Sequence, residues 1–499
     1  MDMLSNLTIG FGVALTLQNV LYCFVGVLLG TVVGVLPGIG PVTTVAMLLP
    51  ISFTLPPESA MILLAGIYYG AQYGGSTTAI LVNIPGEASS VVTTIDGHQM
   101  ARQGRAGPAL GIAAIGSFFA GCVATLLICF AAPPLAAIAL EFGPAEYFSL
   151  MVCGLIAAIV LARGSVMKAI GMVILGLLLG LAGTDVNSGI RRFTFGFQDM
   201  ADGIEFVALS MAIYGIAECA YNLERKAEEA DVTGTIGNVW PSFADIRHCT
   251  PAILRGTVLG SLLGVLPGGG ALLAAFGAYT LEKKVARPPR NFGNGDIRGV
   301  AAPESANNAG AQTSFIPMLT LGIPSNPTMA MMIGALMIHG ISPGPRVMSE
   351  RPELFWGLIA SMWIGNLLLV VLNLPLVGMW VKLLRIPYRL LFPAIVGFCC
   401  IGAYTVNSNI FDVYVMAFFA IFGYLCLKLD CEPAPLILGF VLGPLMEENL
   451  RRALLLSRGD LMVLVQEPLS LIFLIAAALL LLVVAAPAIR RKREEALQE

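Results

Sequence analysis

Long apolar runs recur along almost the whole chain. The clearest of them lie at residues 21–36, 109–135, 147–161, 169–181, 355–381, 413–427 and 469–486. A helix that crosses a bilayer needs about 20 mostly apolar residues, and several of these runs reach that length with their flanks. The pattern therefore predicts an all-α polytopic membrane protein with about 10–14 membrane segments.

The composition agrees with this prediction. Of the 499 residues, 57% are hydrophobic and 12% are charged, whereas a soluble domain carries about 25% charged residues. The ten cysteines show no CxxC spacing, so we interpret them as small core residues rather than disulfide partners or metal ligands. A net charge of −3 gives no indication of a nucleic-acid partner. Residues 1–101 contain no Lys or Arg, so we expect no removable signal peptide.

The basic residues indicate how the chain is oriented. Many of them gather in three stretches: Arg225, Lys226, Arg247 and Arg255; Lys283, Lys284, Arg287, Arg290 and Arg298; and Arg490, Arg491, Lys492 and Arg493. Because cytoplasmic loops are enriched in Lys and Arg, all three stretches, including the tail 490–499, are expected in the cytoplasm. Residues 256–281 then have basic flanks on both sides, which predicts a re-entrant segment that breaks near Pro267 and returns. The alternative is one unbroken helix that violates the charge rule.

An internal repeat relates the two parts of the chain. Residues 26–40 (GVLLGTVVGVLPGIG) and 256–270 (GTVLGSLLGVLPGGG) are identical at nine of fifteen positions. Further matches keep the same order: Gly70-Ala71-Gln72 with Gly310-Ala311-Gln312, Ile84-Pro85 with Ile323-Pro324, and ILGxxLG at 174–180 and 437–443. We therefore expect two homologous transmembrane repeats, 1–225 and 251–489, joined by a cytoplasmic linker at 226–250. Whether they are inverted or parallel is open.

Duplicated halves with discontinuous helices are typical of secondary transporters, which bind their solute between the repeats. Within each repeat copy, glycines recur every fourth residue, and this spacing favours close packing of a neighbouring helix. The Leu-Pro-Gly-x-Gly end of each copy should instead interrupt the helix. Freed N–H groups after the interruption suit a carboxylate, although a mere kink is the alternative. The candidate binding residues there are Gly38, Gly40, Thr43 and Thr44, and Gly268 and Gly270.

A second region of each half is unusually polar. Its hydroxyls and amides can bind carboxylates as donors and cations as acceptors; the alternative is that these are loops facing water. The candidates are Ser76, Thr77, Thr78, Asn83 and Pro85 in the first half, and Asn307, Asn308, Gln312, Ser314, Pro324, Ser325 and Asn326 in the second. Among the acidic residues, only Glu304 joins this set. Glu58, Glu87, Asp96, Asp185, Glu218 and Asp412 are expected at membrane interfaces.

The sequence carries no convincing signature of an enzyme. It has no HExxH, GxGxxG or GxxxxGK[ST] string, and the GxGD string at 293–296 lies among charged residues. We therefore expect neither an enzyme nor an ATPase, and no cofactor other than Na⁺ or H⁺ as a coupling ion. The competing hypothesis is an integral membrane enzyme or lipid-processing protein that uses the same polar cavity. Matching breaks in both halves favour a transporter, because an enzyme needs one asymmetric catalytic set.

Four sequence strings resemble those of one family. The resemblance as a whole extends over nearly the entire chain. They are GTVVGVLPGIGP at 30–41, YGGSTTAILVNIPGE at 73–87, DGHQMARQG at 96–104 and PESANNA at 303–309. In these strings the chain resembles the TctA family, the large membrane subunits of tripartite tricarboxylate transporters. The resemblance implies a multi-pass permease subunit of the bacterial inner membrane, working with a small four-helix membrane subunit and a periplasmic solute-binding protein. It also implies uptake of citrate or another carboxylate, driven by an ion gradient. The particular carboxylate and the oligomeric state stay open.

Overall fold

A computed structural model describes residues 3–36, 40–162, 165–185, 188–224, 238–266, 270–286, 291–383 and 388–485. We call the described residues up to 224 the first half and those from 238 onward the second half. The first half contains α1 (Met3–Ala14), α2 (Leu17–Val35), α3 (Pro41–Ser52), α4 (Pro57–Val82), η1 (Ala88–Ser90), α5 (Val91–Arg102), α6 (Ala106–Leu140), α7 (Pro144–Leu161), α8 (Val166–Gly180), β1 (Gly183–Thr184), β2 (Arg191–Arg192), η2 (Gln198–Met200), α9 (Phe206–Ser210), η3 (Met211–Ala217) and α10 (Glu218–Glu224). Strands β1 and β2 form an antiparallel pair, and η3 is a π-helical turn joining α9 to α10.

The second half is entirely helical in its regular elements. It contains α11 (Phe243–Gly264), α12 (Gly270–Val285), α13 (Arg298–Thr313), α14 (Phe315–Leu321), α15 (Pro327–Ile338), α16 (Arg346–Glu350), α17 (Pro352–Asn373), α18 (Val377–Leu383), α19 (Tyr388–Asn407), α20 (Ile410–Lys428), α21 (Ala434–Leu456), α22 (Val463–Gln466) and α23 (Pro468–Ala485). Helix α11 begins at Phe243, so the end of the expected linker 226–250 is helical.

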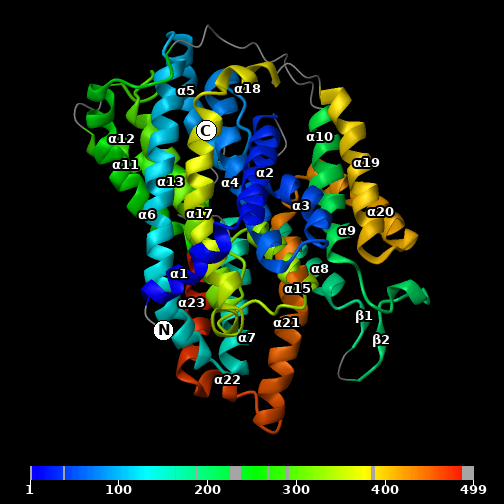
Figure 1. Ribbon diagram of the computed structural model, residues 1–499. Helices are drawn as coiled ribbons and strands as arrows, with labels where there is room; N and C mark the ends of the chain where they lie inside the picture. Colours follow the sequence, from blue (N-terminus) through cyan, green and yellow to red (C-terminus); the bar gives the residue numbers. More distant parts are fainter. Residues whose placement is uncertain are drawn as a thin grey trace.

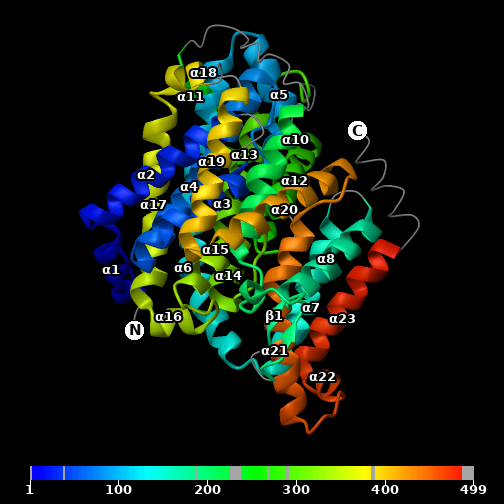
Figure 2. The same ribbon diagram turned by 90° about the vertical axis from the view of Figure 1, so that its right-hand side faces the viewer.

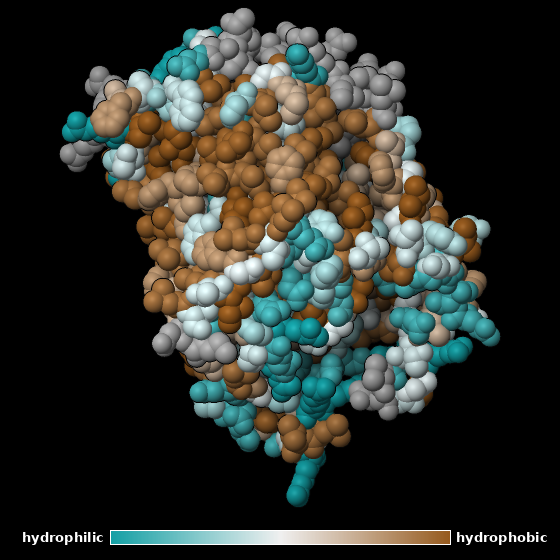
Figure 3. Space-filling view, viewed as in Figure 1, coloured by the Kyte–Doolittle hydropathy of each residue, from teal (hydrophilic) through white to brown (hydrophobic). Residues whose placement is uncertain are grey.

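The helices confirm an all-α polytopic membrane protein. In the described part of the chain, six helices are long and apolar enough to span a bilayer: α2, α6, α7, the continuous α9–α10 segment, α17 and α20. Shorter apolar helices accompany them, and the number of crossings stays a prediction. The face in Figure 3 carries a broad apolar band with hydrophilic surface below it. Exposed side chains of α2 and α17, such as Leu21, Phe24 and Val371, belong to the apolar surface.

The bundle is built around helix α4. Every residue of α4 from Ser59 to Val82 is buried, so neighbours cover this helix on all sides. Helices α11, α12 and α13 lie on one side of it and α10, α19 and α20 on the other (Figure 1). Helices α7, α8, α21 and α23 form a separate group at one end (Figure 2). A polar residue in such an interior helix is unfavourable unless other groups of the protein form hydrogen bonds with it.

Glycines set the closest helix contacts, as their spacing predicts. A Cβ added at Gly26, Gly30 or Gly34 of α2 would collide with a backbone carbonyl of α4. The same holds in the second half, where Gly256, Gly260 and Gly264 of α11 lie against backbone carbonyls of α13. The two glycine stripes are therefore packing surfaces that bring helix backbones together.

The third matched pair of strings also meets in space. Helix α8 carries the first ILGxxLG string and α21 the second, and the two helices pack against each other. Gly176 of α8 lies against the carbonyl of Leu436, while a Cβ at Gly439 of α21 would lie 2.6 Å from the carbonyl oxygen of Val173. Small residues on both helices thus allow the close approach of one half to the other.

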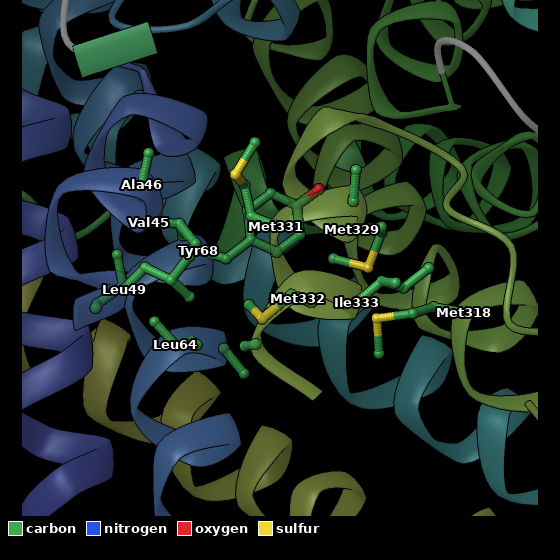
Figure 4. Packing of buried hydrophobic residues seen from close by; sticks show 14 of the residues in the cluster. Val45, Ala46, Leu49, Leu64, Tyr68, Met318, Met329, Met331, Met332 and Ile333 are labelled. Atoms are coloured by element: carbon green, nitrogen blue, oxygen red, sulfur yellow. The ribbon is translucent and has the colours of Figure 1, made fainter. Parts of the chain in front are cut away.

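A methionine-rich apolar layer joins the halves near the centre. Val45, Ala46 and Leu49 of α3 and Leu64 and Tyr68 of α4 face Met318 of α14 and Met329, Met331, Met332 and Ile333 of α15 (Figure 4). These side chains are almost fully buried. Methionine is unbranched and flexible, so such a layer tolerates rearrangement better than one of branched residues.

Asp96 on α5 ties the first half to the loop that precedes α13. Its Oδ1 accepts hydrogen bonds from the backbone N–H groups of Gly293, Gly295 and Asp296 at 2.8, 2.8 and 2.9 Å, and its Oδ2 accepts one from the Tyr279 hydroxyl at 2.8 Å. The side chain is fully buried. Asp96 is therefore held inside the protein by the GxGD string, which is a carboxylate-binding loop, and its expected place at a membrane interface stays a prediction.

The glycine contacts can be tested by adding one methyl group. Gly30→Ala should lower the free energy of unfolding by about 1–3 kcal/mol or more, because the methyl would collide with the carbonyl of Ile67. Gly171→Ala on α8 is the matched control, since nothing lies within 4 Å of that Cβ position. Thermal melting of the detergent-solubilised protein measures both. Equal melting temperatures for the two variants would show that the α2–α4 contact is looser than described.

The Asp96 contact can be tested by proteolysis. Asp96→Ala removes the acceptor of four hydrogen bonds, and we expect it to cost at least about 3 kcal/mol and to speed trypsin cleavage between α12 and α13. The control is Asp202→Ala, which changes an exposed carboxylate. Cleavage at the wild-type rate in Asp96→Ala would mean that the loop is held without this residue.

Candidate solute and ion site

Both Leu-Pro-Gly-x-Gly motifs fall between helices. Helix α2 ends at Val35 and α3 begins at Pro41; α11 ends at Gly264 and α12 begins at Gly270. Gly38 and Gly268 lie outside the described residues. The unbroken helix considered for residues 256–281 is therefore wrong. Helix α12 folds back on α11, since a Cβ at Gly277 would lie 3.2 Å from Leu259 Cδ2. Re-entry into a membrane stays a prediction.

Each interruption lies against the polar stretch of its own half. In the first half, a Cβ at Gly74 of α4 would lie 2.7 Å from Gly34, and the Thr78 hydroxyl donates to the Val35 carbonyl at 2.8 Å. In the second half, Gly264 at the end of α11 packs against Gly310 and Thr313 of α13. The two sequence motifs of each half, distant along the chain, thus form one local structure.

Glu304 on α13 connects the polar stretches of the two halves. Its Oε2 accepts a hydrogen bond from the Ser76 hydroxyl of α4 at 2.6 Å, and its Oε1 accepts one from Thr93 of α5. The carboxylate is 1% exposed, and no Lys, Arg or His among the described residues forms an ion pair with it. Hydroxyl donors alone therefore stabilise this buried acid.

Glu87 forms a second contact between the halves. It lies in the turn after α4, and its Oε1 accepts from Ser89 at 2.6 Å and from Asn307 Nδ2 of α13 at 2.9 Å. Ser89 also lies 3.4 Å from Gln72 Oε1. Glu87 is buried inside the protein, and its expected place at a membrane interface stays a prediction. The string Ile84-Pro85-Gly86 gave a signal for this turn, because it ends α4 and brings the carboxylate back toward the bundle.

The remaining candidates of the polar stretches are buried, with three exceptions: Asn83, Pro85 and Asn326. Asn308 Nδ2 donates to Ser117 Oγ at 2.7 Å, Gln312 Nε2 lies 3.4 Å from Asn366 Oδ1, and Ser325 donates to the Ser314 carbonyl at 3.2 Å. Asn326 is half-buried and caps α15 through Met329 N–H. Because α13 is buried along its whole length, the alternative that these stretches are water-facing loops is wrong for α4 and α13. Pro324 is buried and Pro85 half-buried beside them.

Asn83 lies apart from this cluster. It is exposed at the end of α4, where its left-handed backbone conformation (φ 57°) terminates the helix. Asparagine tolerates that conformation better than most residues. The role that the structure gives Asn83 is therefore that of a helix cap.

The threonines of the first interruption are engaged with the protein. Thr43 donates to the Tyr214 carbonyl at 2.9 Å and to Glu218 Oε2 at 3.0 Å, and Thr44 donates to the Gly40 carbonyl at 2.9 Å. Their hydroxyls therefore hold α3 to the π-helical segment and to its own first turn. Gly40 is the N-cap of α3 and supplies no side-chain cap, and Gly270 is the first residue of α12.

A small cavity lies beside Glu304. Its volume is about 20 Å³, and its polar lining comes from Tyr73, Ser76 and Thr77 of α4, Ser117 of α6, Glu304, and Asn373 at the end of α17. Ser117, Asn373 and the nearby Thr93 were not among the predicted residues, because Ser117 and Asn373 are isolated polar residues in apolar runs and Thr93 belongs to no matched motif of the two halves. Only the fold brings them to the two polar stretches.

Comparison with known proteins supports a transport role. The family model "Tripartite tricarboxylate transporter TctA family" matches residues 20–438. A protein of Agrobacterium vitis, named as an uncharacterized 52.8 kDa protein in the TAR-I ttuC' 3' region, is 58% identical over 499 residues, covering 100% of this chain and 99% of that protein. A second Agrobacterium vitis protein, named for the TAR-II ttuC' 3' region, is 58% identical over 240 residues, covering 48% of this chain and 99% of that protein. No solved structure matches.

The family match covers most of the chain, including both interruptions, both polar stretches and Glu304. It makes the protein a component of a tricarboxylate transporter, a class that works with partner subunits and a binding protein. The chain belongs to the tripartite tricarboxylate transporter TctA family.

Proposed function

We propose that this protein is the large permease subunit of a binding-protein-dependent secondary transporter that takes up citrate or another carboxylate. An ion gradient drives the uptake. The subunit works in the bacterial inner membrane with a small four-helix membrane subunit and a periplasmic solute-binding protein. Its C-terminus is cytoplasmic.

One observation carries the proposal. In each half a broken helix ends against a buried polar stretch, and the polar stretches of the two halves bond to each other through Ser76–Glu304 and Glu87–Asn307. Secondary transporters bind their solutes at the interface of two repeats, beside discontinuous helices. The arrangement here supports a solute site at the same kind of interface.

The first turns of the helices that follow the interruptions supply donors for an anion. In α3 this turn is mostly buried, and Gly40 leaves the N–H groups of Val42 and Thr43 without a side-chain cap. Unpaired N–H groups at a helix start carry partial positive charge and favour carboxylates. The amide Nδ2 of Asn366 and the hydroxyl of Tyr69 are further buried donors without a partner among the described residues. Polar donors rather than cations thus suit a carboxylate that must be released again.

Movement between the halves has a physical basis in the methionine layer. Met318, Met329, Met331 and Met332 of the second half pack on α3 and α4 of the first (Figure 4). Flexible thioether side chains can repack without opening large voids. Such a seam supports the small relative shifts that alternating access requires.

The orientation rests on the basic stretches. Lys283 and Lys284 occupy the last turn of α12, near the end of the molecule where α10 ends (Figure 1). Strands β1 and β2 lie toward the opposite end (Figure 1). The positive-inside rule puts the former end in the cytoplasm and the strands in the periplasm.

The proposal is tested by uptake into proteoliposomes that contain this chain, its small membrane subunit and the binding protein. Labelled citrate and related di- and tricarboxylates should accumulate only under an inward Na⁺ or H⁺ gradient. Asn307→Ala should reduce uptake at least about tenfold, corresponding to about 1.4 kcal/mol, because it leaves Glu87 short of a donor. The control Asn6→Ala changes a half-buried asparagine of α1 and should transport normally.

The same uptake experiment can contradict the transport proposal. If the three proteins assemble but no carboxylate accumulates under either gradient, the transport proposal is wrong. Chemical conversion of a lipid or solute by the purified chain would then favour the competing hypothesis of a membrane enzyme in the same polar cluster.

A further inference from the structure

The cavity beside Glu304 has the size of one small ion. Its volume of about 20 Å³ exceeds the roughly 10–15 Å³ needed to hold one water molecule. It lies between α4 of the first half and α6, α13 and α17 around it. A bound particle there would therefore contact both halves at once.

The hydroxyls that line this cavity donate their protons elsewhere. The Tyr73 hydroxyl donates to the Ala114 carbonyl at 3.4 Å, Thr77 to the Tyr73 carbonyl at 3.3 Å, and Ser117 to the Glu304 carbonyl at 3.4 Å. Ser76 donates to the Glu304 carboxylate. Because each proton is engaged, these oxygens have only lone pairs left to offer, and lone pairs attract a cation.

Asn373 supplies an independent sign of a missing ligand. It is 4% exposed, and its Nδ2 donates to the Leu369 carbonyl at 2.9 Å, which fixes the orientation of the amide. Its Oδ1 is buried and has no hydrogen-bond partner among the described residues. A buried acceptor in that state is unfavourable unless something binds it.

The charge of the lining points to a monovalent ion. Glu304 is its only acidic residue and has no basic partner among the described residues. Hard oxygen ligands suit alkali and alkaline-earth cations, and divalent ions usually recruit more than one carboxylate. A proton would neutralise Glu304 but would leave Asn373 Oδ1 to be paired by a separate water molecule. A small metal cation would both neutralise Glu304 and bind Asn373 Oδ1.

We infer that this cavity binds one Na⁺ as the coupling ion, held by Glu304, Asn373 and the hydroxyls of Ser76, Thr77 and Ser117. The inference rests on the proposed transport function and gives it a mechanism. Na⁺ binds residues of both halves and so stabilises one relative position of them. It also neutralises Glu304, and this neutralisation lowers the repulsion between the carboxylate and an approaching anionic solute.

Binding of ²²Na⁺ to the purified full-length chain in detergent tests the site directly, without solute or partner subunits. We expect saturable binding of one ion, weakened at least about tenfold in Glu304→Gln and in Asn373→Leu. Thr77→Val preserves the shape of the side chain and should weaken binding to a smaller degree. The matched control is Glu58→Gln in the first turn of α4, about 27 Å along the helix from Ser76, which should bind like the wild type.

Gel filtration of each variant identifies any that fails to fold, and Thr77→Val keeps the test decisive if a Glu304 variant is lost. Unchanged ²²Na⁺ binding in all three site variants would overturn the inference. So would absent Na⁺ binding together with carboxylate uptake driven by a pH gradient, a result that would leave the transport function standing. Saturable Na⁺ binding at this site without any carboxylate uptake would instead contradict the proposed function.

Discussion

The contact of glycine-lined helices with backbone carbonyls is the constraint on which the rest of this structure depends. Gly26, Gly30 and Gly34 bring α2 against α4, and Gly256, Gly260 and Gly264 bring α11 against α13. Side chains at these positions would push the helices apart. The ends of α2 and α11 would then no longer reach Thr78 and Thr313. Helix packing therefore determines where the polar side chains of this protein lie.

The same helix packing also buries the polar stretches. Helices α4 and α13 are shielded from solvent and lipid almost completely, and within a membrane every polar group there must find a partner inside the protein. Most do, through contacts such as Ser76–Glu304 and Asn307–Glu87. In the described part of the chain a few do not, among them Asn373 Oδ1 and Asn366 Nδ2.

The sequence was a good guide to features with a local signature. Apolar runs predicted an all-α membrane bundle, glycine spacing predicted the helix contacts, and proline followed by glycines predicted both interruptions. Glu304 was singled out because an acid in such a polar string is costly to bury. The contacts of Glu87 with Asn307 and of Asp96 with Tyr279 could not be predicted, since nothing local reveals that a carboxylate is turned back into the bundle. Ser117 and Asn373 join the site only through tertiary packing of α6 and α17, which no motif encodes.

The two halves resemble each other only partly in their interruptions and buried acids. Both halves place an interruption beside a polar stretch, but each buried acid differs in its setting: Glu87 lies in a turn and Glu304 in the middle of a helix. The halves also differ after the interruption, where α12 folds back along α11 whereas α3 packs on α15 and α19. The helix after the interruption therefore has different neighbours in the two halves.

The most direct test of the whole account is a cryo-EM structure of the assembled transporter with citrate and Na⁺. We predict solute density between α4 and α13, within reach of the first turns of α3 and α12. Solute bound away from both polar stretches, with Ser76–Glu304 and Glu87–Asn307 unchanged in every state, would contradict it.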